Sequence, residues 1–235
     1  MAPQHAMHRW ADRAALADAL AGAVANDLRA AIDARGHAVL ALSGGTTPEC
    51  FLRCLSGQPV EWLRVTVTLV DERWVASNHA RSNARLVRES LLQGAAARAR
   101  FVPLYTDAPD PESGCAAIAQ RIEALPLPLD VAVLGLGLDG HTASWFPDGD
   151  RLAQALDPQG AASVLPMRAP AAGEPRITLT LPVLAAARAL YLHIEGAEKA
   201  RVFDAVMRSE GALAASPLRT LMQKAHAPLS VYWCA

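Results

Sequence analysis

The sequence predicts an α/β fold in which a mostly parallel sheet carries helices on both faces, and three observations predict it. Short, unbroken apolar runs such as 38–42 and 130–136 are typical of strands buried on both faces. Such runs alternate along the chain with segments of helical periodicity. No internal repeat or break in composition interrupts this alternation, so we expect residues 1–235 to form one domain. The predicted architecture is therefore a three-layer, Rossmann-like α/β/α domain.

Composition excludes several classes of protein. Hydrophobic residues make up 52% of the chain and charged residues 19%, which argues against disorder. The 23 acidic residues nearly balance 22 basic ones, so we expect no nucleic-acid partner and no membrane-surface partner, since both usually require a basic excess. No apolar run is long enough for a bilayer, and the start of the chain lacks a signal pattern. Four scattered cysteines do not suggest a disulfide framework, so we expect a cytoplasmic protein. The sequence does not choose between a monomer and a homodimer.

The first half of the chain is predicted to open with a long helix. Leucines and alanines recur at helical spacing over residues 10–35, and a glycine is placed to end the helix. The apolar run 38–42 predicts the first strand, and the β-branched run 65–70 predicts the next. The remaining predicted elements of this half are helices over about 47–55, 82–92 and 112–124, and a short strand over 101–104.

The second half is predicted to continue the same alternation. The strand 130–136 breaks into a glycine-rich loop, and residues 147–175, rich in Pro, Gly and Ala, are expected to form a long surface connection. The later predicted elements are strands over 176–181 and 189–194, a helix over 197–207, and an edge strand over 229–233. In open α/β sheets ligands bind outside the carboxyl ends of the strands. The loops to examine for chemistry therefore follow Leu42, Val70, Leu134 and Ile194.

The first of these loops is a strand-to-helix turn suited to an anion. Two adjacent glycines let backbone N–H groups approach a ligand closely, and the helix N-terminus behind them favours negative charge. Hydroxyl groups on both sides add donors. A capped tight turn, with Thr46 or Thr47 as N-cap, explains the pattern equally well, and the loop is neither a Walker loop nor a full dinucleotide fingerprint. The residues of the predicted phosphate loop are Ser43, Gly44, Gly45, Thr46 and Thr47.

The second loop places three consecutive charges directly after a predicted buried strand. They are Asp71, Glu72 and Arg73. The planar fork of Arg73 is suited to clamping a phosphate or carboxylate. A solvated loop with an internal pair between Asp71 and Arg73 remains an equal alternative.

The third loop carries the strongest signal for catalysis. His141 follows Asp139 by two residues in a glycine-rich loop, which fits a general base with a carboxylate that orients its ring. Gly135, Gly137 and Gly140 match G-x-G-x-x-G, but the acidic residue that a dinucleotide site needs about 20 positions later falls in the predicted surface connection. No dinucleotide cofactor is therefore expected.

Other residues complete the candidate set. Lys199, which opens a predicted helix after residue 194, is a second candidate phosphate ligand, and Arg176 is a third. Trp74 and Trp145 each follow a candidate loop, so we expect both indoles to lie near one cleft. The remaining histidines, His5, His8, His37, His193 and His226, are expected to be structural or surface residues.

Taken together, these segments resemble the 6-phosphogluconolactonases, hydrolases of the pentose phosphate pathway. The related glucosamine-6-phosphate deaminases carry the loop Gly-His-Ile-Ala-Phe-Asn-Glu-Pro, whose Glu assists sugar ring opening. Phe146 occupies that Glu position here and cannot exchange a proton, and Arg73 stands where the deaminases usually have Tyr, so the resemblance favours the lactonases. The matching motifs occur in the family's order from about residue 38 to 233: 43–48, 71–73 with 82–83, 135–147, 176–180 and 196–199.

The resemblance implies hydrolysis of 6-phospho-D-glucono-1,5-lactone without a metal or an organic cofactor. His141 would accept a proton from the attacking water, with Asp139 supporting the ring. Arg73 would serve either the oxyanion or the phosphate, and the sequence does not choose between them. The small-molecule partner would be a sugar phosphate, held by Ser43, Gly44, Gly45, Thr46, Asp71, Arg73, Lys199 and Arg176.

Two other functions stay open at this stage. An amino-sugar-phosphate deaminase or isomerase would release ammonia from glucosamine 6-phosphate. A non-catalytic sugar-phosphate-binding module would bind 6-phosphogluconate without turnover, although such a sensor usually needs an attached output domain.

Overall fold

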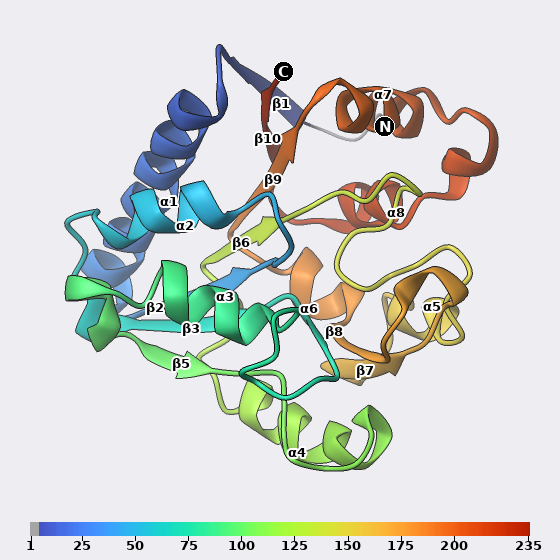
Figure 1. Cartoon of the computed structure of the whole chain (residues 1–235), viewed down its shortest axis with the longest axis horizontal. Helices are drawn as coiled ribbons and strands as arrows, with labels where there is room; N and C mark the ends of the chain where they lie inside the picture. Colours follow the sequence, from blue (N-terminus) through green and yellow to red (C-terminus); the bar gives the residue numbers. More distant parts are fainter. Residues whose placement is uncertain (1–4) are drawn as a thin grey trace.

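The structure, a computed structural model, describes residues 5–235 and contains one large parallel sheet (Figure 1). Its seven strands follow the order β1-β10-β9-β6-β2-β3-β5, and every neighbouring pair is parallel. The expectation of a mostly parallel sheet is confirmed. The strands are β1 (His5–Trp10), β2 (Ala38–Leu42), β3 (Val65–Leu69), β5 (Arg100–Val102), β6 (Val131–Leu134), β9 (Ala189–Glu195) and β10 (Leu229–Cys234).

Helices cover this sheet and complete the three-layer α/β fold. The Asp12 side chain accepts a hydrogen bond from the Ala15 N–H at 2.8 Å and caps the first helix, and Gly36 ends it with φ +77°. Leu16, Leu20 and Leu28 on its inner face are fully buried. The helices are α1 (Arg13–Arg35), α2 (Glu49–Ser56), α3 (Asn83–Ser90), α4 (Pro111–Glu123), α5 (Leu152–Ala155), α6 (Leu181–Ala185), α7 (Ala197–Arg208) and α8 (Pro217–Lys224).

A second, antiparallel sheet was not predicted. It consists of β4 (Asp71–Arg73), β8 (Arg176–Leu179) and β7 (Val164–Met167), in the order β4-β8-β7. The surface connection predicted over 147–175 is therefore wrong in part, because it contains β7 and α5. β4 has three charged residues and looks like a loop, yet it pairs with β8. The Leu179 N–H donates to the Val70 carbonyl at 2.9 Å, which attaches the small sheet to the end of β3.

Two predictions near the termini are also corrected. The first helix begins at Arg13 rather than at residue 10, because Asp12 caps it and residues 5–10 form β1. β1 pairs with β10 and occupies the edge of the sheet, so β10 is an interior strand rather than the predicted edge strand. The sequence of β1 lacks a continuous apolar run because most of its side chains are exposed.

None of the helices in residues 5–235 is long and apolar enough to cross a membrane.

Candidate active site

A cavity of about 290 Å³ lies at the carboxyl ends of β2, β3, β6 and β9. Strand order reverses here, because the chain adds β3 and β5 on one side of β2 and then returns to add β6 and β9 on the other. Such a switch point is where open α/β sheets bind ligands. All but one of the predicted site residues line it: Ser43, Gly44, Gly45, Thr46, Asp71, Arg73, His141, Arg176 and Lys199.

The glycine loop after β2 closes one end of this cavity. Gly45 adopts φ +97°, a conformation that favours glycine, and a Cβ at Gly44 would overlap the side-chain amide of Asn83. Pro48 is the N-cap of α2, and no side chain caps that helix. The alternative in which Thr46 or Thr47 serves as the N-cap is therefore wrong, and their hydroxyl groups are not used in capping.

Lys199 joins the glycine loop from the first turn of α7. Its Nζ donates to the Thr47 hydroxyl at 3.0 Å, across 152 positions of sequence. Burial lowers the pKa of Lys199, although the nearby Glu195 carboxylate acts in the opposite direction. A half-buried ammonium group beside a glycine-rich loop provides positive charge for binding an anion. The nearly neutral chain as a whole does not supply that charge.

The small sheet positions the acidic residues of β4 on opposite faces. Asp71 lies on the cavity side, where its carboxylate accepts a hydrogen bond from Ser144 Oγ at 2.5 Å. Glu72 points the other way, because successive side chains of a strand alternate. Its carboxylate accepts from the N–H groups of Arg73, Asn83 and Ala84 at 2.7–2.8 Å, and from the Ser82 hydroxyl at 3.1 Å. Burial raises the pKa of Glu72, and these N–H groups partly offset the rise.

Glu72 therefore holds the start of α3 against β4. The same segment brings in Asn83, whose Nδ2 donates to the Asp71 carbonyl at 2.9 Å while its amide lies beneath Gly44. The loops after β2 and β3 are thus connected through one buried amide.

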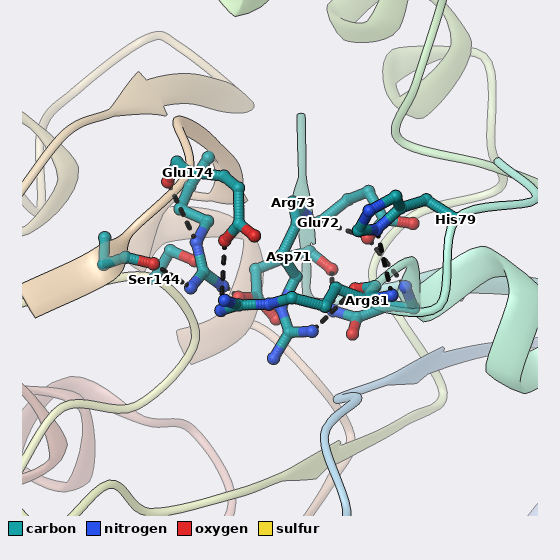
Figure 2. Close-up of polar contacts among 10 residues, drawn as sticks. Asp71, Glu72, Arg73, His79, Arg81, Ser144 and Glu174 are labelled. Atoms are coloured by element: carbon teal, nitrogen blue, oxygen red, sulfur yellow. Dashed lines mark hydrogen bonds and ion pairs between the residues drawn. The ribbon is translucent and has the colours of Figure 1, made fainter. Parts of the chain in front are cut away.

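Three arginines line the side of the cavity formed by the small sheet, and Figure 2 shows two of them, Arg73 and Arg81. Arg73 Nη1 donates to the Arg81 carbonyl at 2.7 Å, and its Nε is buried without a partner among the described residues. Arg176 is buried, donates to the Ala172 carbonyl at 2.6 Å, and lies over the Phe146 ring at 5.5 Å. Burial lowers the pKa of Arg176. Sequence analysis missed Arg81, whose side chain forms an ion pair with Glu174 at 3.0 Å.

His141 and Asp139 lie side by side, as the sequence predicted. His141 Nδ1 lies 2.5 Å from Asp139 Oδ1, and the His141 N–H donates to the same oxygen at 3.2 Å. Burial alone would raise the pKa of Asp139, but the hydrogen bond and charge of His141 lower it below its usual range. An ionised carboxylate accepts only, so it assigns the proton to Nδ1 and leaves Nε2 with a free lone pair. Asp139 does not itself line the cavity and contacts it through His141.

Glycines fix the conformation of this loop. A Cβ at Gly137 would overlap both the imidazole of His141 and the carboxylate of Asp139, and Gly140 has φ +83°. Ser216 Oγ, from the start of α8, donates to the Gly140 carbonyl at 2.9 Å. The pairing of His141 with Asp139 therefore depends on two positions without side chains and on a contact from a distant helix.

Two other expectations fail at the site. Trp145 is fully buried and its Nε1 donates to the Leu179 carbonyl at 2.9 Å, while Trp74 Nε1 donates to the Ala108 carbonyl at 3.1 Å. Neither indole lines the cavity, so the prediction that both lie near the cleft is wrong. His193, expected to be an ordinary structural residue, is buried but does line the cavity, with Nε2 3.1 Å from Glu195 Oε1. No group of three or more His, Cys, Asp or Glu residues in 5–235 is arranged to hold a metal ion.

Comparisons with known proteins agree on one family. Residues 11–233 match the family model described as glucosamine-6-phosphate isomerases/6-phosphogluconolactonase. The chain is 50% identical to a 6-phosphogluconolactonase of Rhizobium meliloti (strain 1021), over 97% of both chains. It is 51% identical to a 6-phosphogluconolactonase of Mesorhizobium japonicum, over 94% of this chain and 92% of that one. Among solved structures, a 6-phosphogluconolactonase from Shewanella baltica OS155 superimposes with a TM-score of 0.94 at 37% identity, covering 100% of both chains.

Proposed function

Because this chain belongs to the glucosamine-6-phosphate isomerase/6-phosphogluconolactonase family, we propose that His141 is the general base with which it hydrolyses 6-phospho-D-glucono-1,5-lactone. The activity is that of a carboxylic ester hydrolase in the oxidative branch of the pentose phosphate pathway, and its product is 6-phospho-D-gluconate. The observation that carries the proposal is the pair of His141 and Asp139 in the same cavity as the glycine loop and Lys199.

The phosphate of the substrate binds at the glycine-loop end in this proposal. Backbone N–H groups of Gly44 and Gly45, the nearby hydroxyl groups and the ammonium group of Lys199 supply the donors and the positive charge. Because Lys199 already contacts Thr47 Oγ1, its ammonium group is held beside the loop. Fixing the phosphate positions the distant lactone carbonyl and reduces the entropy lost in the reaction.

His141 then activates water at the other end of the substrate. Its Nε2 takes a proton from a water molecule as the water oxygen bonds to C1, and Asp139 stabilises the imidazolium that forms. The tetrahedral intermediate collapses by breaking the bond between C1 and the ring oxygen, which receives the proton from His141 and leaves as a hydroxyl group. The resulting carboxylic acid ionises in water, and His141 is returned to its starting state.

We assign Arg73 to the developing oxyanion rather than to the phosphate. Its guanidinium is anchored to the Arg81 carbonyl, on the side of the cavity formed by the small sheet, whereas Lys199 is anchored in the glycine loop. Its buried Nε lacks a partner among residues 5–235 and remains able to donate. A positioned charged donor stabilises negative charge that appears only in the transition state.

The deaminase reaction lacks a required group here. Phe146 stands where the deaminases carry their Glu, and its ring packs 4.5 Å from the His141 ring and beneath Arg176. A phenyl ring cannot exchange a proton with a sugar ring oxygen.

The proposal is tested by timed hydrolysis of freshly generated 6-phosphogluconolactone, corrected for its spontaneous opening. We expect rapid opening of the phosphorylated lactone, much slower opening of unphosphorylated gluconolactone, and no ammonia from glucosamine 6-phosphate. Equal rates with the two lactones would contradict the phosphate site. Binding of 6-phosphogluconate without turnover of the lactone would indicate the sensor instead.

We place the enzyme in the cytoplasm. The four cysteines, Cys50, Cys54, Cys115 and Cys234, are all free thiols, which suits a reducing compartment.

A further inference from the structure

Arg81 lines the cavity, and its carbonyl anchors Arg73, but its side chain has no role in the proposed reaction. It lies in the loop between β4 and α3, and Figure 2 shows its extended side chain reaching toward Glu174. Arg81 Nη2 lies 3.0 Å from Glu174 Oε2, with side-chain exposures of 51% and 23%. That oxygen is buried, and its contact with Arg81 does not satisfy hydrogen-bond geometry. The two groups are therefore paired by charge without being locked together.

The side of the cavity where Arg81 lies has more positive than negative charge. The guanidinium groups of Arg73, Arg81 and Arg176 lie there, and two carboxylates, Asp71 and Glu174, act on the same Arg176 group. Asp71 is already engaged by Ser144. Among the described residues, one positive charge at this end is left without a compensating carboxylate, which favours an anionic ligand.

The three arginines differ in how firmly their donors are held. Arg176 donates to two backbone carbonyls, those of Ala172 and Glu174, and Arg73 donates to the Arg81 carbonyl. The Arg81 side chain is paired, within residues 5–235, with the Glu174 carboxylate alone. A ligand carboxylate is therefore able to replace Glu174 as the partner of the Arg81 guanidinium.

We propose that Arg81 is an exchangeable carboxylate-binding residue. Its guanidinium separates from Glu174 and pairs instead with the carboxylate of a sugar-acid phosphate. This inference rests on the proposed function, which places C1 of the substrate on the side of the arginines. The lactone is uncharged at C1, whereas the product carries a carboxylate there. Arg81 therefore distinguishes product from substrate, and the competition from Glu174 limits how tightly the product is retained.

Two ligands that differ only at C1 separate this role from phosphate binding. 6-Phosphogluconate carries a carboxylate at C1, and glucitol 6-phosphate carries a hydroxymethyl group in its place. Calorimetric titration of both ligands into the wild-type protein should give tighter binding of the first. Arg81→Met should lower the affinity for 6-phosphogluconate by roughly tenfold, which is the scale of a charge-assisted hydrogen bond. The affinity for glucitol 6-phosphate should change by less than about twofold. The Arg81 carbonyl that anchors Arg73 is kept in this variant.

Glu174→Gln provides a test of opposite sign. It removes the competing charge and keeps the backbone carbonyl that Arg176 uses, so 6-phosphogluconate should bind roughly two- to fivefold more tightly, the scale of a partly exposed ion pair. Arg168→Met is the matched control, because Arg168 forms a comparable ion pair with Glu112 at 2.8 Å outside the cavity. It should leave both affinities unchanged. In steady-state assays, Arg81→Met should raise the inhibition constant of the product while changing KM for the lactone by less than about twofold.

An equal loss of affinity for both ligands in Arg81→Met would overturn the inference. Arg81 would then bind the phosphate or support the fold. Unchanged or weaker binding of 6-phosphogluconate in Glu174→Gln would also overturn it, because no competition would then exist. Failure of the wild-type protein to bind either ligand would overturn the proposed function itself, and this inference with it.

Discussion

Asp139→Asn tests how the carboxylate beside His141 acts. The substitution preserves the shape of the side chain, and the amide oxygen can still accept from Nδ1, so the ring orientation is retained while the negative charge is lost. The hydrogen bond of 2.5 Å is charge-assisted in the wild type. Charged hydrogen bonds contribute about 1.5–3 kcal/mol and neutral ones about 0.5–1.5 kcal/mol. Because both side chains are about one-third exposed, at 30% and 38%, we take the low end of the difference.

A difference of about 1 kcal/mol in the transition state corresponds to a roughly fivefold lower kcat. The assay is hydrolysis of fresh 6-phosphogluconolactone. Asp139→Ala removes the acceptor altogether and should cost about 10²-fold. An Asp139→Asn enzyme with unchanged kcat would show that the negative charge of Asp139 does not act on His141.

Three further predictions concern the residues that support the cavity. Burial lowers the pKa of Lys199, so loss of its charge should weaken 6-phosphogluconate binding as pH rises, starting below the ordinary lysine range near 10.4. Lys199→Arg should retain its affinity at high pH. A wild-type affinity that does not fall as pH rises would contradict this prediction. Gly44→Ala should weaken 6-phosphogluconate binding at least about tenfold, because the new Cβ displaces the Asn83 amide. The control is Gly22→Ala in a helix, where the new Cβ has no neighbouring atom within 4 Å, and this variant should bind normally. Equal affinities of the two variants would show that the loop tolerates a side chain. Burial raises the pKa of Glu72, so the folded state holds the carboxyl proton more tightly than the unfolded chain does. The free energy of unfolding of the wild type, measured in urea relative to Glu72→Gln, should therefore decrease as pH rises above about 4.3. A difference that is constant with pH would argue against a buried charge.

The central part of the fold was predictable because its strands carry a direct signal. β2, β3 and β6 are continuous apolar or β-branched runs, and β9 is mostly apolar apart from His193 and its last residue, Glu195; burial on both faces requires that pattern. The sheet rule then selected the four loops that do form the cavity. The glycine loop, Arg73, His141 and Lys199 were located in this way without any knowledge of their distances.

The small sheet lacked such a signal. β4 consists of three charged residues, and β7 contains a proline. Their pairing depends on contacts with β8, which begins 103 positions after the end of β4 and nine after the end of β7, and such contacts leave no local periodicity. β1 was missed for a related reason, since an edge strand with mostly exposed side chains has no apolar run.

The missed site residues share one property, which is that their role depends on tertiary contacts. Arg81 and Glu174 come from loops 93 positions apart and meet only because β4 pairs with β8. Asn83 matters because its amide lies beneath Gly44. The Ser82-Asn83 pair after Asp71-Glu72-Arg73 was the one available signal for this region, and it indicated family membership without indicating a contact.

The central claim is that His141 is the general base, and the most direct test compares catalysis with binding in one variant. In His141→Ala, kcat for fresh 6-phosphogluconolactone should fall by roughly 10²-fold or more, the usual scale for loss of a general base. The affinity for 6-phosphogluconate should change far less, because the glycine loop and Lys199 still hold the phosphate. Turnover should therefore be lost while binding is retained. A His141→Ala enzyme with near-wild-type kcat would remove His141 from the mechanism.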